Sequence, residues 1–384
     1  MAAASSPGLA TAPGPLIPQA APGPAAGGRG SRLLALDGLR LVAALMVCLY
    51  HYVGRGGVVS ASWHGSPAHL FPTLSGAAVY GNFGVELFFV ISGFVICMSS
   101  WGRTLGDFFR SRVARLYPAY WVALVLVTGA SLALPVVVHA VRLDEFLVNL
   151  TMLQQPMGAT RVLGVCWTLW VEVRFYVLFA LLVVLRGVTY RRVVLFACVW
   201  TLASVLCHST NNNLLNQVVM PQYAPFFIGG LALYLIHRFG SDLLTWGIVA
   251  MSWLLAQREA TLGLWGPHPH RDPYVVILIV TVAFAAVAVV ALGWTRWASW
   301  SWLVTAGALT YPFYLIHEHL GWFAIRVLHR SLGLPAWPTL AVTVLGMLGL
   351  AWLIHRFVER PFGPRLKRAL KGRKLASRSS GLGF

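Results

Sequence analysis

The stretch LDGLRLVAALMVCLYHY, residues 36–52, decides the fold class. Its centre is a continuous apolar run, which is the composition of a helix that crosses a lipid bilayer. Asp37 and Arg40 stand at one end of this run, and His51 stands at the other. Ionisable groups are costly inside a membrane and are usually functional there. The stretch therefore predicts a membrane-spanning helix with a polar group near each end.

Similar apolar runs recur along almost the whole chain. It has 384 residues, of which 58% are hydrophobic and 10% are charged, the profile of a polytopic membrane protein. The runs are too long and continuous for barrel strands, so the expected fold is an all-α transmembrane bundle. Ten spans are predicted, at residues 37–53, 79–100, 117–138, 164–185, 193–209, 218–237, 243–257, 274–293, 300–323 and 338–355.

The apolar core is flanked by two polar tails. Residues 1–31 are mostly Ala, Pro, Gly and Ser and predict a disordered N-terminal tail rather than a signal peptide. Residues 32–363 form the predicted membrane domain. Residues 364–384, which include the run KRALKGRKLASRSS, form a basic tail expected in the cytoplasm beside anionic lipids.

The formal charge of +18 is distributed unevenly between the loops. With both termini in the cytoplasm, ten spans place 20 Lys and Arg residues on the cytoplasmic side and seven on the other. The positive-inside rule therefore predicts cytoplasmic termini in the cell (inner or plasma) membrane. Topology accounts for the charge, so no nucleic-acid partner is expected. The five cysteines have no metal-ligand spacing, so no metal site is expected.

Arg40 and His51 share one face of the first predicted helix. They are eleven residues apart, which at ~100° per residue returns to within about 20° of the same face, roughly 16 Å further along the axis. Two ionisable groups on one face favour a polar site over simple packing. Asp37 is predicted to cap this helix and to pair with Arg40, and a share in substrate binding is left open.

Other spans carry ionisable groups at a similar predicted depth. Glu86 lies in the second span, Glu172 in the fourth, and Tyr314 and His317 in the ninth. The predicted orientation places His51, both acids and His317 in the outer part of the membrane. Each could be a packing partner when taken alone, but together they predict a polar site.

A cationic patch precedes the third span, in FFRSRVARLYPAYW. Arg112 and Arg115 are three residues apart and share a helical face at the cytoplasmic membrane surface. Guanidinium groups bind phosphates with paired hydrogen bonds, so a phosphorylated cytoplasmic ligand is expected. Lipid headgroups are the alternative.

Six segments resemble the integral-membrane acyltransferase family 3, which includes bacterial polysaccharide O-acetyltransferases and macrolide O-acyltransferases. They occur in the family's order over about residues 32–368 and are LDGLRLVAALMVCLYHY, GVELFFVISGF, RVARLYPAYW, WTLWVEVRFY, LTYPFYLIH and RFVERPF. The resemblance implies ten or so transmembrane helices and acyl transfer from acyl-CoA to a hydroxyl group. It also implies importance for Arg40, His51, Arg112, Arg115 and Glu172. Glu86 replaces a common Asp, and Thr168 replaces a common Ser.

These residues suggest a mechanism without a tightly bound cofactor, in which acyl-CoA, with acetyl-CoA as the default, is the donor. Arg112 and Arg115, with Arg40, would bind its phosphates. His51 would act as the general base toward the acceptor hydroxyl, because neutral imidazole suits that task near pH 7. Glu86 or Glu172 could orient His51, with His317 and Tyr314 nearby. Covalent routes through His51 or Cys48 are left open.

The acceptor is expected to be a sugar of the envelope, a lipid-linked precursor, or a hydroxyl of a polyketide or macrolide antibiotic. Two rival functions are a proton-coupled transporter or flippase of glycan precursors and a non-catalytic membrane scaffold. A transporter predicts symmetric halves and paired broken helices, and neither pattern is present in the sequence. A scaffold leaves the ionisable groups without a purpose.

Overall fold

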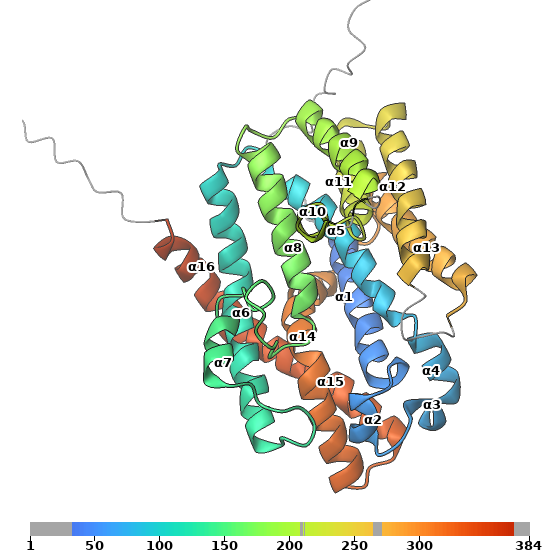
Figure 1. Ribbon diagram of the computed structural model, residues 1–384, viewed down its shortest axis with the longest axis vertical. Coiled ribbons are helices and arrows are strands. Elements are labelled where there is room, and N and C mark those ends of the chain that lie inside the picture. Colours follow the sequence, from blue (N-terminus) through green and yellow to red (C-terminus); the bar gives the residue numbers. More distant parts are fainter. Residues whose placement is uncertain (1–32, 208–209, 211, 264–270, 372–384) are drawn as a thin grey trace, which may run out of the picture.

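A computed structural model describes residues 33–207, 210, 212–263 and 271–371. Within these residues the chain forms helices and their connections, with no strand. Figure 1 shows the long helices gathered into a bundle. The predicted all-α class is therefore confirmed. The predicted N-terminal tail, residues 1–31, lies outside the described residues.

The helices follow one another along the whole described chain. The first half contains α1 (Leu34–Leu49), η1 (Tyr50–Gly54), α2 (Val58–Trp63), α3 (Pro67–Leu70), α4 (Pro72–Ala78), η2 (Gly81–Phe83), α5 (Gly84–Ser100), α6 (Leu105–Ala133), α7 (Leu143–Asn149), α8 (Cys166–Phe179) and η3 (Ala180–Val184). The second half contains α9 (Tyr190–Cys207), α10 (Asn213–Val219), α11 (Ala224–Phe239), α12 (Leu243–Leu262), α13 (Pro273–Ala291), α14 (Trp302–Ile325), η5 (Arg326–Ser331), α15 (Ala336–Ile354), η6 (His355–Glu359) and α16 (Arg360–Ala369).

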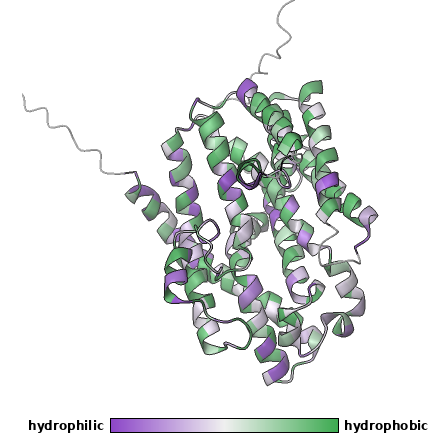
Figure 2. Ribbon diagram, viewed as in Figure 1, coloured by the Kyte–Doolittle hydropathy of each residue, from purple (hydrophilic) through white to green (hydrophobic). Residues whose placement is uncertain are grey.

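Eight helical segments of the described chain are long and apolar enough to cross a membrane. They coincide with eight of the ten predicted spans, and α12 and α14 lie at the other two. These two helices carry the polar runs QRE (257–259) and HEH (317–319), which lower their hydropathy. Figure 2 shows hydrophobic residues along most of the length of the long helices. The chain is a multi-pass membrane protein.

Helices α1, α5, α11 and α14 form the centre of the bundle, because α1 packs along α14 and α5, and α5 packs along α11. The α5–α11 contact requires glycine. A Cβ on Gly93 would lie 2.1 Å from the carbonyl oxygen of Phe227, and one on Gly230 would lie 2.0 Å from that of Val90. Small residues let membrane helices approach closely. This close packing fixes the positions of the helices that carry the polar groups.

The segment 150–165, between α7 and α8, is tied down by hydrogen bonds. Asn149 is fully buried; its Nδ2 donates to Thr160 O (2.8 Å), and its Oδ1 accepts from Val162 N (3.1 Å). Thr160 N and Oγ1 donate to Glu145 Oε1, at 3.2 and 2.6 Å. The bonds from Thr160 lower the pKa of Glu145, so its carboxylate is charged at neutral pH. Residues 160–162 are therefore held in one place.

The C-terminal helices run on from one another. Helix α15 continues through η6 into α16, and α16 packs against α6. The predicted boundary between membrane domain and basic tail, at residues 363 and 364, falls inside α16. The first residues of the predicted tail are therefore helical, and the rest of the tail from residue 372 lies outside the described residues.

Candidate active site

The first helix places its two ionisable side chains in different cavities. Arg40, in α1, lines a cavity of about 90 Å³ together with Arg112 and Arg115, which we call the inner cavity. His51, in the π-helical turn η1 that continues α1, lines a cavity of about 470 Å³, which we call the outer cavity. Arg40 and His51 therefore lie toward opposite ends of one helix and line separate cavities.

His51 pairs with His317 of α14. The Nδ1 atom of His51 lies 3.0 Å from Nε2 of His317, and Nδ1 of His317 lies 2.9 Å from the carbonyl oxygen of Tyr314. A carbonyl only accepts hydrogen bonds, so His317 carries its proton on Nδ1. In a neutral pair, His317 Nε2 then accepts from His51 Nδ1, which leaves a lone pair on Nε2 of His51. The sequence predicted both histidines for the site, and the structure brings them together.

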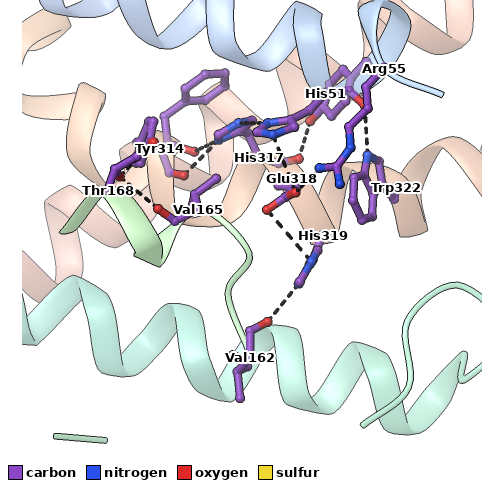
Figure 3. A network of polar contacts seen from close by, with 12 residues as sticks. His51, Arg55, Val162, Val165, Thr168, Tyr314, His317, Glu318, His319 and Trp322 are labelled. Carbon is purple, nitrogen blue, oxygen red and sulfur yellow. Dashed lines mark hydrogen bonds and ion pairs between the residues drawn. The ribbon is translucent and has the colours of Figure 1, made fainter. Parts of the chain in front are cut away.

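Two further hydrogen bonds connect the helices around this pair. Tyr52 OH donates to the carbonyl oxygen of His317 (2.7 Å), and Trp322 Nε1 donates to that of His51 (3.0 Å). Both histidines are buried. Figure 3 shows the imidazole rings of His51 and His317 side by side. The orientation of His51 is therefore fixed by the two helices that carry the pair.

The acidic group nearest to His51 is Glu318. Its Oε1 lies 3.5 Å from His51 Nε2 and accepts a hydrogen bond from Arg55 Nη1 at 3.3 Å. Its Oε2 lies 3.9 Å from His319 Nε2 and has no hydrogen-bond partner among the described residues. A Cβ on Gly164 would lie 2.1 Å from Oε2, so a larger residue there would displace this carboxylate. Figure 3 shows Glu318 between His51, Arg55 and His319.

The outer cavity is lined by residues from α14, η1 and the segments on either side of α7. Besides His51 and Glu318, its lining includes Arg55, Arg161 and Trp322. The guanidinium carbon of Arg55 lies over the ring of Trp322, 5.9 Å from the ring centre. His319, also in the lining, bonds through Nδ1 to the carbonyl oxygen of Val162 (2.8 Å). The cavity is large enough for a small-molecule group beside a histidine and a carboxylate.

The inner cavity contains the predicted arginines and one of the predicted acids. Glu172 accepts hydrogen bonds from Ser92 Oγ (2.7 Å) and from Tyr176 OH. Arg112 donates from Nη2 to Ser99 Oγ (3.0 Å). Glu172 is close enough to Arg40 and Arg112 for favourable charge interaction. This cavity therefore presents positive charge partly balanced by one carboxylate.

Tyr314 stands between the two cavities. It lines the inner cavity with Thr168, and the two hydroxyl oxygens lie 3.0 Å apart. Thr168 Oγ1 also donates to the carbonyl oxygen of Val165 (2.9 Å), and Val165 lines the outer cavity. The tyrosine ring lies 5.5 Å from that of His317, measured between centres. A hydroxyl pair and an aromatic ring thus separate the arginines from His51.

Two predicted placements differ from the structure. Asp37 does not cap α1, because the helix begins at Leu34 and its N-cap is Leu33. Asp37 lies in the first turn instead, where a Cβ on Gly307 would be 2.2 Å from its Oδ1. Second, the sequence predicts that His51, Glu86, Glu172 and His317 meet in one polar site, but of these four the structure pairs the two histidines with each other. Glu172 belongs to the inner cavity, and Glu86 Oε2 is buried without a hydrogen-bond partner among the described residues.

Sequence reasoning therefore missed the acid that lies beside His51. The signal was present, because Glu318 follows His317 directly in LTYPFYLIHEHL. Predicted depth alone favoured Glu86 and Glu172, although depth does not say which helices touch. Arg55 and Arg161 are two of the seven basic residues that the charge distribution places on the non-cytoplasmic side, and nothing else in the sequence marks them. Their place in the outer cavity depends on the fold of the segments that carry them.

Comparison with known proteins gives the family. The Acyl_transf_3 family, described as an acyltransferase domain, matches residues 33–356. Acyltransferase MdmB of Streptomyces mycarofaciens is 26% identical over 373 residues, which cover 86% of this chain and 91% of the relative. No solved structure matches significantly. The match includes both cavities and the histidine pair, so the chain belongs to this family and is a membrane acyltransferase.

Proposed function

We propose that the protein transfers an acyl group, with acetyl as the default, from acyl-CoA to a hydroxyl of a sugar or of a polyketide or macrolide. The observation that carries this proposal is the position of His51. Its pairing with His317 leaves Nε2 as a base at the wall of the outer cavity. The other end of the same helix meets the arginines of the inner cavity. A base for the acceptor and cations for the donor thus lie at the two ends of α1.

The inner cavity fits the narrow part of acyl-CoA. The space of about 90 Å³ is narrow, so the nucleotide would stay outside and only part of the pantetheine arm would lie in it. Arg115 is exposed and Arg112 is partly buried, so phosphates outside the cavity can reach both. Guanidinium groups bind phosphate through charge-assisted hydrogen bonds. The thioester would pass Tyr314 to reach His51, and no other cofactor is needed.

The transfer step uses His51 as a general base. The acceptor hydroxyl gives its proton to Nε2 while its oxygen attacks the thioester carbonyl carbon. The carbon–sulfur bond then breaks, and the leaving thiolate takes the proton from the imidazolium to give free CoA. All atoms of the two products come from the acceptor and acyl-CoA, and His51 returns to its neutral form. Direct transfer is the simplest route that this geometry supports.

Glu318 favours this step because it faces Nε2. The neutral His51 places no proton toward the carboxylate, whereas the imidazolium places a donor 3.5 Å from Oε1. The attraction therefore grows as the proton moves to His51, and stabilisation that grows toward the transition state raises the rate. Arg55 holds the Glu318 carboxylate in place through the hydrogen bond from its Nη1 to Oε1. Glu318 thus takes the role that the sequence gave to Glu86 or Glu172.

The experiment that tests this function is an acyl-transfer assay with purified protein in nanodiscs and acetyl-CoA. Candidate acceptors are envelope sugars, lipid-linked glycan precursors and macrolides. We expect one acceptor class to stimulate release of free CoA and to gain one acyl group by mass spectrometry. The alternative, a proton-coupled transporter or flippase, predicts no acceptor-dependent CoA release with any class. The family supports the enzyme over this alternative.

We also propose that both termini face the cytoplasm and that the protein lies in the cell membrane, which the charge asymmetry supports. Single cysteines at Ser66 and Ser241, in a variant without the native five, test this. Both positions are exposed, before α3 and after α11 respectively. With an impermeant thiol reagent, Ser66→Cys should react in intact cells and Ser241→Cys only after lysis. The opposite pattern would invert the donor and acceptor sides.

A further inference from the structure

We infer that the acceptor carries an anionic group, a carboxylate or a phosphate, which Arg161 binds in the outer cavity. This inference rests on the proposed function, in which the outer cavity holds the acceptor. It adds a chemical class to that acceptor.

The outer cavity has one cation more than its acid can balance. Among the described residues of its lining, the cations that are always charged are Arg55 and Arg161, and the acid is Glu318. Glu318 Oε1 is already engaged by Arg55 (3.3 Å). The side chain of Arg161 donates from Nη1 to the neutral amide oxygen of Gln155 (3.0 Å). Arg161 thus contributes a positive charge that a ligand anion can match.

The backbone on both sides of Arg161 is fixed. Thr160 is held by Glu145 and Asn149, and Val162 N donates to Asn149 Oδ1 (3.1 Å). The carbonyl oxygen of Val162 accepts from Nδ1 of His319 (2.8 Å), which also lines the cavity. None of these bonds uses the Arg161 side chain. The fold therefore presents this guanidinium at the cavity without depending on it for stability.

The size of the cavity sets where the anion lies on the acceptor. One space of about 470 Å³ contains both Arg161 and the base His51. An acceptor that fills it must carry the anionic group near the reacting hydroxyl, on the same sugar ring or an adjacent one. Acidic sugars and sugar phosphates both meet this requirement. Arg161 is exposed, so its charge is solvated until an acceptor fills the cavity, and a neutral acceptor would then leave it without an ionic partner there.

Binding of three simple probes tests the inference without the acyl donor. The probes are methyl β-glucuronide for a carboxylate, glucose 1-phosphate for a phosphate, and methyl β-glucoside as the neutral control. We expect purified protein in detergent to bind one or both anionic probes at least about tenfold more tightly than the glucoside. The preferred probe then separates carboxylate from phosphate. Equal binding of all three, or binding of none, would overturn the inference.

Variants assign the preference to Arg161. Arg161→Gln should lose this preference, with affinity for the anionic probe falling about tenfold to a hundredfold. Arg258→Gln is the matched control, because Arg258 is an exposed arginine of α12 outside this lining and pairs with Glu259. An Arg161→Gln protein that still prefers the anion would overturn the assignment.

The donor-free readout keeps this inference separate from the proposed function. Anion-selective binding that depends on Arg161, without any acyl transfer, would support an anion site at Arg161 and contradict the proposed function. Acyl transfer to a neutral acceptor, unaffected by Arg161→Gln, would do the reverse.

Discussion

The two cavities differ in the groups that line them and in size. The inner cavity has three arginines, a hydrogen-bonded carboxylate and about 90 Å³ of space. The outer cavity has His51, which is paired with His317 behind it, a carboxylate beside His51 and about 470 Å³ of space. Arginine binds anions but does not exchange protons near pH 7, whereas histidine does. The contrast indicates that binding and proton transfer are divided between the two sides.

The largest effect should follow from His51→Ala. Removal of a general base lowers the rate typically 10²–10⁴-fold, whereas an alanine fits the helix without strain. The turnover rate of purified protein with acetyl-CoA and an acceptor measures this loss. His69→Ala is the control, because His69 is an exposed histidine of α3 outside both cavities. Activity of the His51 variant above about a tenth of wild type would contradict the role of His51 as base.

Replacing Glu318 should give the next largest loss. Glu318→Gln keeps the shape beside Gly164 but removes the charge that favours protonated His51. Charged hydrogen bonds are worth about 1.5–3 kcal/mol, so kcat should fall roughly tenfold to a hundredfold. The Michaelis constant for acyl-CoA should stay the same, because Glu318 lines only the outer cavity.

Glu86→Gln provides the comparison for that loss. The sequence offered Glu86 or Glu172 as the partner of His51, whereas the structure places Glu86 in neither cavity lining. We expect its kcat to stay near wild type. A loss at Glu86 with none at Glu318 would favour the sequence-based assignment over the geometric one.

The contrast between these two acids shows what the sequence could and could not predict. Apolar runs located the long helices of the described residues because hydrophobicity is a local property. The same runs do not say which helices touch, and His51 and His317 are 266 residues apart. Glu318 reaches His51 only because α1 and α14 pack together. The arginine group of the inner cavity was predicted because Arg112 and Arg115 lie within one helical turn.

Replacing the arginines of the inner cavity should instead change the Michaelis constant for the acyl donor. Arg112→Gln and Arg115→Gln should each raise the Michaelis constant for acyl-CoA about tenfold, because each removes a charge-assisted contact to phosphate. The effect of Arg115→Gln should shrink as salt rises, since this arginine is exposed and screened. Initial rates over a range of acyl-CoA concentrations measure both constants. If only the Michaelis constant for the acceptor rose, the inner cavity would be the acceptor site and the outer cavity the donor site.

The smallest effect is expected between the cavities, at Tyr314. Tyr314→Phe removes the hydroxyl that bonds Thr168 but keeps the ring that lies against His317. One neutral hydrogen bond contributes about 0.5–1.5 kcal/mol, so the change in kcat should be about tenfold or less. If the hydroxyl pair only closes the passage for the thioester, its loss should let water reach the thioester more easily. The variant should then hydrolyse acetyl-CoA faster than wild type when no acceptor is present. Release of free CoA in the absence of acceptor measures this leak. A leak no greater than that of wild type, with a loss of kcat as large as that of Glu318→Gln, would place Tyr314 in the transfer step rather than between the two cavities.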